Sequence, residues 1–299
     1  MIQASARARN GKREWTIFPF VNAIVMMLLV FITLYPFYYV MIGSISGDNV
    51  AAQDIYFLYP KGPSLGAYAM VFSTPSILRA YGNTLFITVI GTFLSLLLTM
   101  FTAYPLSKAR FRGRRLFTLI FYFTMLFSGG LVPTYLVIRD LNMIDKLWAL
   151  ILPKLISVYN MLLLINFFKS IPEGLEESAT IDGANDLTIL MRIVLPLSLP
   201  IFATLTLFYA VGYWNSWFDA VMYINRSKNF PLQLVLREII QSVDLSYVAG
   251  GGADYSMSDT TIQSVRLATL VVAILPIMSV YPILQKYFVK GVLIGAIKG

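Results

Sequence analysis

The 299-residue sequence contains no cysteine and no histidine, and only 13% of its residues are charged. Without cysteine there are no disulfides, no thiolate metal ligands and no cysteine nucleophile. Without histidine, the commonest general base and the commonest metal ligand are also missing. No apolar segment contains paired carboxylates. These absences argue against an intramembrane enzyme, and the sequence predicts neither catalytic residues nor a metal site.

The composition is that of a membrane protein. Hydrophobic residues make up 58% of the chain and its mean hydropathy is +0.72, which leaves too few charges for a soluble surface. We therefore predict an all-α integral membrane protein with about six transmembrane helices in a permease domain over residues 18–285. The expected spans are residues 18–42, 82–107, 116–138, 147–168, 197–224 and 267–285.

The distribution of Lys and Arg predicts the orientation. Six spans place both termini on one side, and the segments on that side hold fourteen Lys and Arg residues against eight on the other. Cytoplasmic segments of membrane proteins carry this excess. The N-terminal segment 1–17, the tail 286–299 and the loop 169–196 are therefore expected in the cytoplasm, with the long loop 225–266 outside. The net charge of +8 is attributed to this topology and to membrane lipid, and not to nucleic acid.

The loop 169–196, KSIPEGLEESATIDGANDLTILMRIVLP, is the most distinctive stretch. It holds five of the fifteen acidic residues. Pro172 stands where a helix begins, and acids follow in the first turns, where negative charge suits the helix dipole. Gly183 offers a place for the helix to bend. The pattern predicts a short helix, a small-residue elbow and a second short helix, which together would form a rigid projection that docks into a partner.

The spacing within this loop resembles a known family. The loop resembles the Glu-Ala-Ala loop of ABC importer permeases in the order and spacing of its residues. Glu177-Ser178-Ala179 is followed after three residues by Gly183, after nine more by Ile193, and after one more by Leu195-Pro196. The one departure is Ser178, a small residue in place of the usual alanine. The resemblance implies a cytoplasmic coupling helix that sits in a groove of a separate ATPase. The residues expected to make this contact are Glu176, Glu177, Ser178, Ala179, Asp182, Gly183 and Ala184.

Two more segments resemble the maltose-type carbohydrate-uptake permeases, namely WNSWFDA at 214–220 and YFVKGVLIGAIKG at 287–299. In that family the tail reaches between the ATPase subunits, and the long loop that 225–266 matches in position reaches into the solute-binding protein. Residues 127–153 resemble a branch associated with complex or acidic oligosaccharides. The expected ATPase contacts in the tail are Gly295, Ala296, Ile297, Lys298 and Gly299.

The resemblance implies a permease subunit of an ATP-driven importer for sugars or oligosaccharides in a bacterial cytoplasmic (inner) membrane. Its implied partners are a second homologous permease in a heterodimer, two ATPase subunits and a periplasmic or lipid-anchored sugar-binding protein. The sequence has no GxxxxGK[ST] motif, so ATP and Mg are expected on the ATPase and no cofactor on this chain. The two permeases would enclose the pathway, and ATPase closure would drive alternating access.

Residues that contact the sugar are harder to predict. Sugars favour aromatic faces with hydrogen-bonding groups beside them, but the same aromatic residues could pack the bundle or lie at the membrane interface. Lys154 could attract an acidic sugar or be paired structurally, since an intramembrane charge needs a cavity or a partner. The candidate pathway residues are Asn160, Tyr209, Tyr213, Trp214, Asn215 and Asp219.

Two other classes of transporter compete with this interpretation. A secondary transporter would be expected to carry an ion site within the membrane, whereas intramembrane charge is sparse here and the distinctive residues lie in the cytoplasmic loop. An importer permease for another solute class is the nearer alternative. Only the resemblance of the tail and of residues 214–220 argues against it.

Overall fold

The structure, a computed structural model, describes residues 17–46, 59–60, 62–241 and 262–296. Within these ranges every regular element is a helix, which confirms the predicted all-α class. Most of the predicted N-terminal segment and residues 297–299 of the predicted tail contacts lie outside the described residues, as do 242–261 of the long loop.

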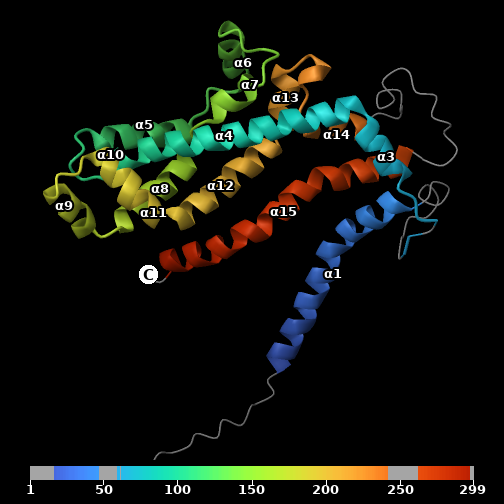
Figure 1. The fold of residues 1–299 in the computed structure, drawn as a ribbon, viewed down its shortest axis with the longest axis horizontal. Helices are drawn as coiled ribbons and strands as arrows, with labels where there is room; N and C mark the ends of the chain where they lie inside the picture. The colour runs from blue at the N-terminus through green and yellow to red at the C-terminus, as the bar shows by residue number, and fades with distance from the viewer. Residues whose placement is uncertain (1–16, 47–58, 61, 242–261, 297–299) are drawn as a thin grey trace, which may run out of the picture.

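The bundle is built around α4 (Pro75–Ser107), the long central helix in Figure 1. It packs against α12 (Leu199–Trp214) and α8 (Val158–Ser170), and α15 (Ile262–Ala296) packs against α12. One face of α4 is buried at helical spacing and is dominated by small and hydroxyl side chains, which let neighbouring helices approach closely. These buried residues are Ala80, Thr84, Ile87, Gly91, Ser95, Thr99 and Ala103.

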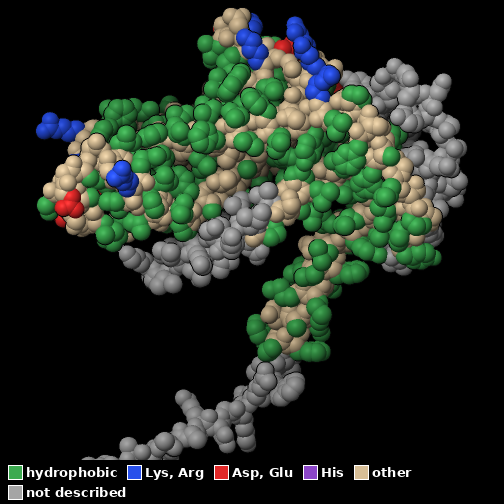
Figure 2. Space-filling view, viewed as in Figure 1, with side chains coloured by type: hydrophobic (Ala, Val, Ile, Leu, Met, Phe, Trp, Pro, Cys, Tyr) green, Lys and Arg blue, Asp and Glu red, His purple; other side chains and the backbone are tan. Residues whose placement is uncertain are grey.

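Helix α1 (Ile17–Ile45) leaves the bundle at an angle and contacts α15 and α3 (Gly66–Ser73). No residue of its most apolar window is buried. Figure 2 shows apolar side chains over α1 and over the sides of the bundle, while charged side chains gather mainly at the left end and at the top. This distribution fits a protein whose sides face lipid.

By length and composition, α1 and α4 can each cross a membrane, and three bent helix pairs raise the number to as many as five. The predicted count of six spans stays a prediction. The third expected span is two helices, α5 (Arg114–Leu126) and α6 (Leu131–Asp140), bent by 111°. Gly130 has a φ of +91° at this break, a backbone conformation that favours glycine, so this residue allows the chain to turn sharply.

The other two bends also fall inside expected spans or at their ends. The segment formed by α7 (Trp148–Ile151) and the 3₁₀ turn η1 (Leu152–Lys154) meets α8 at 47°, and the segment Asp186–Leu197 meets α12 at 83°. The expected fifth span continues beyond α12 as α13 (Trp217–Tyr223). Helix α15 runs unbroken to Ala296, so most of the predicted tail is a continuation of the last helix.

The loop between α6 and α7 is fastened to the segment after α13. Asp145 Oδ1 accepts hydrogen bonds from the backbone N–H groups of Asn225 at 2.6 Å and Arg226 at 2.8 Å. Asn229, in the 3₁₀ turn η3 (Ser227–Asn229), donates to the Asp145 carbonyl at 2.6 Å. The amphipathic helix α14 (Leu232–Gln241) follows, so the first part of the long loop 225–266 is ordered and anchored.

Desolvation acts to raise the pKa of Asp145, but the two backbone donors and the Arg226 guanidinium outweigh it. The Arg226 Nε atom lies 3.7 Å from Asp145 Oδ2. The pKa of Asp145 therefore lies below its ordinary value of 3.8.

Candidate functional site: a clamped elbow and a bundle cavity

The loop 169–196 folds as predicted, into two short helices joined by a tight elbow. The first helix, α9 (Glu173–Ile181), begins directly after Pro172 with Glu173 and Glu176 in its first turn. The second arm starts as α10 (Asp186–Ile189) and continues through the π-helical turn η2 (Leu190–Val194) and α11 (Leu195–Leu197). The predicted helix–elbow–helix is confirmed.

Hydrogen bonds at the elbow define its geometry. The Gly183 N–H donates to the Thr180 carbonyl at 3.0 Å, and the Ala184 N–H donates to the Ala179 carbonyl at 2.9 Å. With Gly183 at a φ of +84°, this pair of bonds is a Schellman motif, in which a left-handed residue ends a helix and satisfies its last carbonyls. The next helix is capped at once, because Asn185 Oδ1 accepts from the Thr188 N–H at 2.8 Å.

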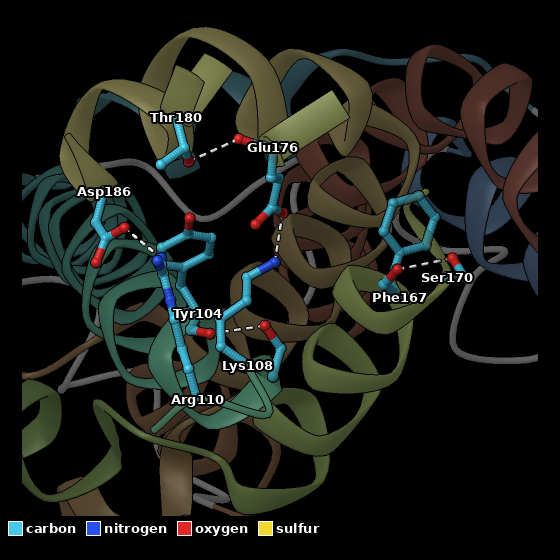
Figure 3. A network of polar contacts seen from close by, with 9 residues as sticks. Tyr104, Lys108, Arg110, Phe167, Ser170, Glu176, Thr180 and Asp186 are labelled. Carbon is cyan, nitrogen blue, oxygen red and sulfur yellow. Dashed lines mark hydrogen bonds and ion pairs between the residues drawn. The ribbon is translucent and has the colours of Figure 1, made fainter. Parts of the chain in front are cut away.

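Two ion pairs attach the elbow to the segment that follows α4. Lys108, directly after the last residue of α4, pairs with Glu176 of α9, and Arg110 pairs with Asp186 of α10. Figure 3 shows these two contacts side by side, one on each arm. Lys108 Nζ also lies 4.9 Å from the ring centroid of Tyr104, a cation–π contact. We call Lys108, Arg110, Glu176 and Asp186 the elbow clamp.

The two halves of the clamp differ in exposure. The side chains of Lys108 and Glu176 are 17% and 14% exposed, whereas those of Arg110 and Asp186 are 58% and 64% exposed. The first pair therefore dominates, since exposed ion pairs contribute little. The sequence analysis attributed the excess of Lys and Arg to topology and membrane lipid and missed this role. The opposite charges of residues 108–115 and 169–196 were the available signal.

The outer surface of the elbow is free of the bundle. Of the predicted coupling residues, Glu177, Ser178, Asp182 and Gly183 are exposed, while Glu176, Ala179 and Ala184 are half-buried against the chain. The sequence analysis overlooked the apolar residues beside them. Ile181 is 86% exposed at the end of α9, and Leu187 is 57% exposed on the second arm. The projecting surface thus combines acidic and apolar side chains.

A cavity of about 890 Å³ lies between the η1–α8 break and α12. It brings together Asn160, Tyr209 and Tyr213 from the predicted pathway residues, with Lys154 beside them. Trp214, Asn215 and Asp219 are not among its lining residues. Trp214 instead donates from its indole N–H to the Ala273 carbonyl at 3.2 Å, and Asn215 donates to the carbonyl of Val211 at 3.0 Å.

The two cavity tyrosines use their hydroxyl groups to join helices. Tyr209 Oη lies 2.7 Å from Thr99 Oγ1 and accepts from the Ser157 N–H at 3.1 Å. Tyr213 Oη lies 2.9 Å from Ser95 Oγ. Its ring fills the space beside Gly91, where an added Cβ would approach ring carbons to 2.8 Å. The hydroxyl groups of both tyrosines are therefore already engaged in hydrogen bonds between helices.

Lys154 is paired with Asp219, and this contact joins η1 to α13. The sequence analysis left open whether Lys154 serves an acidic substrate or a structural partner, and the structure shows the partner. Lys154 also lines the cavity, so the residue takes part in both the ion pair and the cavity wall.

Comparisons with known proteins identify the class of transporter. No protein-family model matches the chain. It is 47% identical over 268 residues to protein LplC of Bacillus subtilis, covering 90% of each chain. It is 42% identical over 279 residues to the polygalacturonan/rhamnogalacturonan transport system permease protein YtcP of the same organism, covering 92% of this chain and 96% of that one.

A solved structure agrees. A chain from a crystal structure of a bacterial ABC transporter involved in import of the acidic polysaccharide alginate matches with a TM-score of 0.86 at 35% identity. The match covers 96% of this chain and 100% of that one. These likenesses define a membrane transport subunit rather than an enzyme. The chain belongs to the permease subunits of ABC importers, in which ATP hydrolysis is carried out by a separate ATPase.

Proposed function

We propose that this permease imports oligosaccharides and that its elbow, residues 169–196, couples the transmembrane helices to a separate ATPase. The observation that carries the coupling proposal is the elbow clamp. Both arms of an exposed helix pair are held to the end of the central helix α4 by ion pairs. A force applied to the elbow would therefore reach α4 directly.

The elbow surface also limits what the ATPase groove can look like. Ile181 projects with 86% exposure, and exposed Glu177 and Asp182 lie close to it in sequence. A groove with an apolar floor and basic residues at its rim would complement this surface, since buried apolar contacts supply affinity and charge complementarity fixes the docking register.

The remaining parts of the importer follow from the same proposal. Six spans, cytoplasmic termini and a cytoplasmic elbow agree with the excess of Lys and Arg on that side. A second permease in a heterodimer would complete the pathway, two ATPase subunits would bind ATP and Mg, and a sugar-binding protein would dock on the outer side near 225–266. The anchored segment from Asn225 to α14 would give that protein a firm surface.

The names of two relatives support an oligosaccharide as substrate. YtcP is named for polygalacturonan and rhamnogalacturonan transport, and the similar solved transporter is involved in alginate import. We propose the same broad class for this chain, with acidic oligosaccharides as its members.

The test is a mild-detergent purification of the chain from its native membranes, followed by uptake measurements after reconstitution. We expect a second permease and an ATPase to co-purify, and uptake of an oligosaccharide to require ATP. Changing Gly183 to valine should release or uncouple the ATPase. A chain that purifies alone and moves solute without ATP would contradict the proposal and favour a secondary transporter.

A further inference from the structure

The bundle cavity has the properties of a binding site for a small polar ligand. Its volume of about 890 Å³ falls within the roughly 300–1,000 Å³ of small-molecule sites, which are largely apolar with a few placed polar groups. Among its described lining residues, Lys154 alone is charged. The cavity can therefore offer one ammonium group, already paired with Asp219, to a ligand in otherwise weakly polar surroundings.

The position of Lys154 suits ligand binding. It ends the 3₁₀ turn η1, at the 47° break before α8, so it lies on irregular backbone inside an otherwise helical bundle. Its side chain is 43% exposed, whereas that of Asp219 is 21% exposed. Asp219 is absent from the cavity lining. The carboxylate is the less exposed partner of the pair. An ammonium has three N–H donors, so Lys154 can donate to Asp219 and to a ligand.

Aromatic faces complete the site. The rings of Tyr159 and Phe208 lie 6.5 Å apart with an angle of 38° between their planes. Both line the cavity, and both are exposed, at 54% and 38%. The C–H face of a pyranose ring can bury apolar surface against such rings. The two rings contact each other across α8 and α12, and their exposure leaves part of each ring open to the cavity.

We propose that Lys154 binds the carboxylate of a uronic acid residue in the cavity, and that Asp219 orients the ammonium and competes with that carboxylate. This assignment rests on the proposed import of oligosaccharides and names the group that selects acidic ones. A substrate carboxylate forms a charge-assisted hydrogen bond with Lys154, the stronger class of hydrogen bond. A neutral sugar forms no such bond.

The test uses the complete importer, with its ATPase and binding protein, reconstituted in liposomes. Two probes are compared, trigalacturonate and its methyl ester, which differ in the carboxylate charge. We expect Lys154→Gln to lower uptake of trigalacturonate at low concentration by about tenfold or more, the loss expected for one charge-assisted hydrogen bond, and Lys154→Arg to retain most of it. Asp219→Asn removes the competing carboxylate and should lower the KM for trigalacturonate.

A structural role predicts something different, because both single variants break the same ion pair. If Lys154→Gln and Asp219→Asn reduce uptake of both probes alike, the proposal is wrong. The double variant Lys154→Gln/Asp219→Asn leaves no unpaired charge, and we expect it to fold and to lose the preference for the acid. ATP-driven uptake of neutral sugars alone would overturn this assignment and the proposed acidic class of substrate, but it would not contradict ATP-driven import of oligosaccharides. Absence of any ATP-driven uptake of oligosaccharides would refute the proposed function itself.

Discussion

Replacing Gly183 by alanine tests the elbow with the smallest possible change. Gly183 has a φ of +84°, and a Cβ placed there meets no atom within 4 Å. The methyl group therefore creates no clash, and its only cost is the left-handed backbone. Gly174, in α9 of the same loop, also has open space around its Cβ position but has no positive φ. The pair Gly183→Ala and Gly174→Ala isolates the conformational effect.

The expected magnitude follows from backbone energetics. Placing an L-residue such as alanine in the left-handed region raises the free energy of that conformation by about 1–2 kcal/mol. Gly183→Ala therefore destabilises the elbow conformation by that amount. Since each 1.4 kcal/mol is a factor of ten, ATPase affinity should fall by up to about 5- to 30-fold, because docking has to restore any elbow that the strain has displaced. Gly174→Ala should be neutral or stabilise α9 by about 0.5–1 kcal/mol, because alanine favours the helix interior.

The assay is titration of the purified ATPase against the reconstituted permease pair, with ATP-driven uptake measured in parallel. Gly183→Asn serves as a second control, because asparagine tolerates the left-handed conformation; it should lose less affinity than alanine does. Equal behaviour of Gly183→Ala and Gly174→Ala would refute the claim that docking needs this elbow geometry.

Two further predictions concern the clamp and the outer loop. Lys108→Glu and Glu176→Lys should each weaken the coupling of ATP hydrolysis to uptake. Each should also lower the free energy of unfolding by about 1–3 kcal/mol, between the values for exposed and buried pairs. The double variant with both exchanges should recover part of the coupling and part of the stability, and no recovery would contradict the pairing. Asp145 has a pKa below its ordinary value, so its stabilising effect is complete above pH 4 or so and is lost as the pH falls through the folded pKa. Asparagine also tolerates the φ of +62° at this position. The melting temperatures of the original chain and of Asp145→Asn should therefore differ at pH 7 and approach each other as the pH falls below about 4. A difference that does not change with pH would contradict this.

The elbow could be predicted because its signals are local. Pro172 at the helix start and Gly183 at the bend lie within a dozen residues of each other, and each has one dominant conformational preference. The Schellman bonds and the Asn185 cap follow the same local rules. Composition likewise predicted the all-helical class, because few alternatives place this much apolar surface in a bilayer.

The clamp and the cavity could not be predicted, since they depend on packing between distant segments. Lys108 and Glu176 are 68 residues apart, and Lys154 and Asp219 are 65 apart. The packing of α4, α8 and α12 brings these residues together, and the sequence alone does not show how the helices pack. The 111° bend between α5 and α6 shows a related difficulty, because a glycine pair marks a break but does not give its angle.

The central claim, that the elbow docks on the ATPase at the cytoplasmic face, can be tested with one introduced cysteine. The chain has no cysteine of its own, so Ile181→Cys, at a position that is 86% exposed, gives a unique label site. In inside-out vesicles a membrane-impermeant maleimide should label it when the ATPase has been stripped away and fail to label it when the ATPase is restored. Asp140→Cys, at a position predicted on the opposite side, should be labelled only in right-side-out vesicles. Labelling of Ile181→Cys that the ATPase leaves unchanged, or that occurs from the outside, would contradict the account.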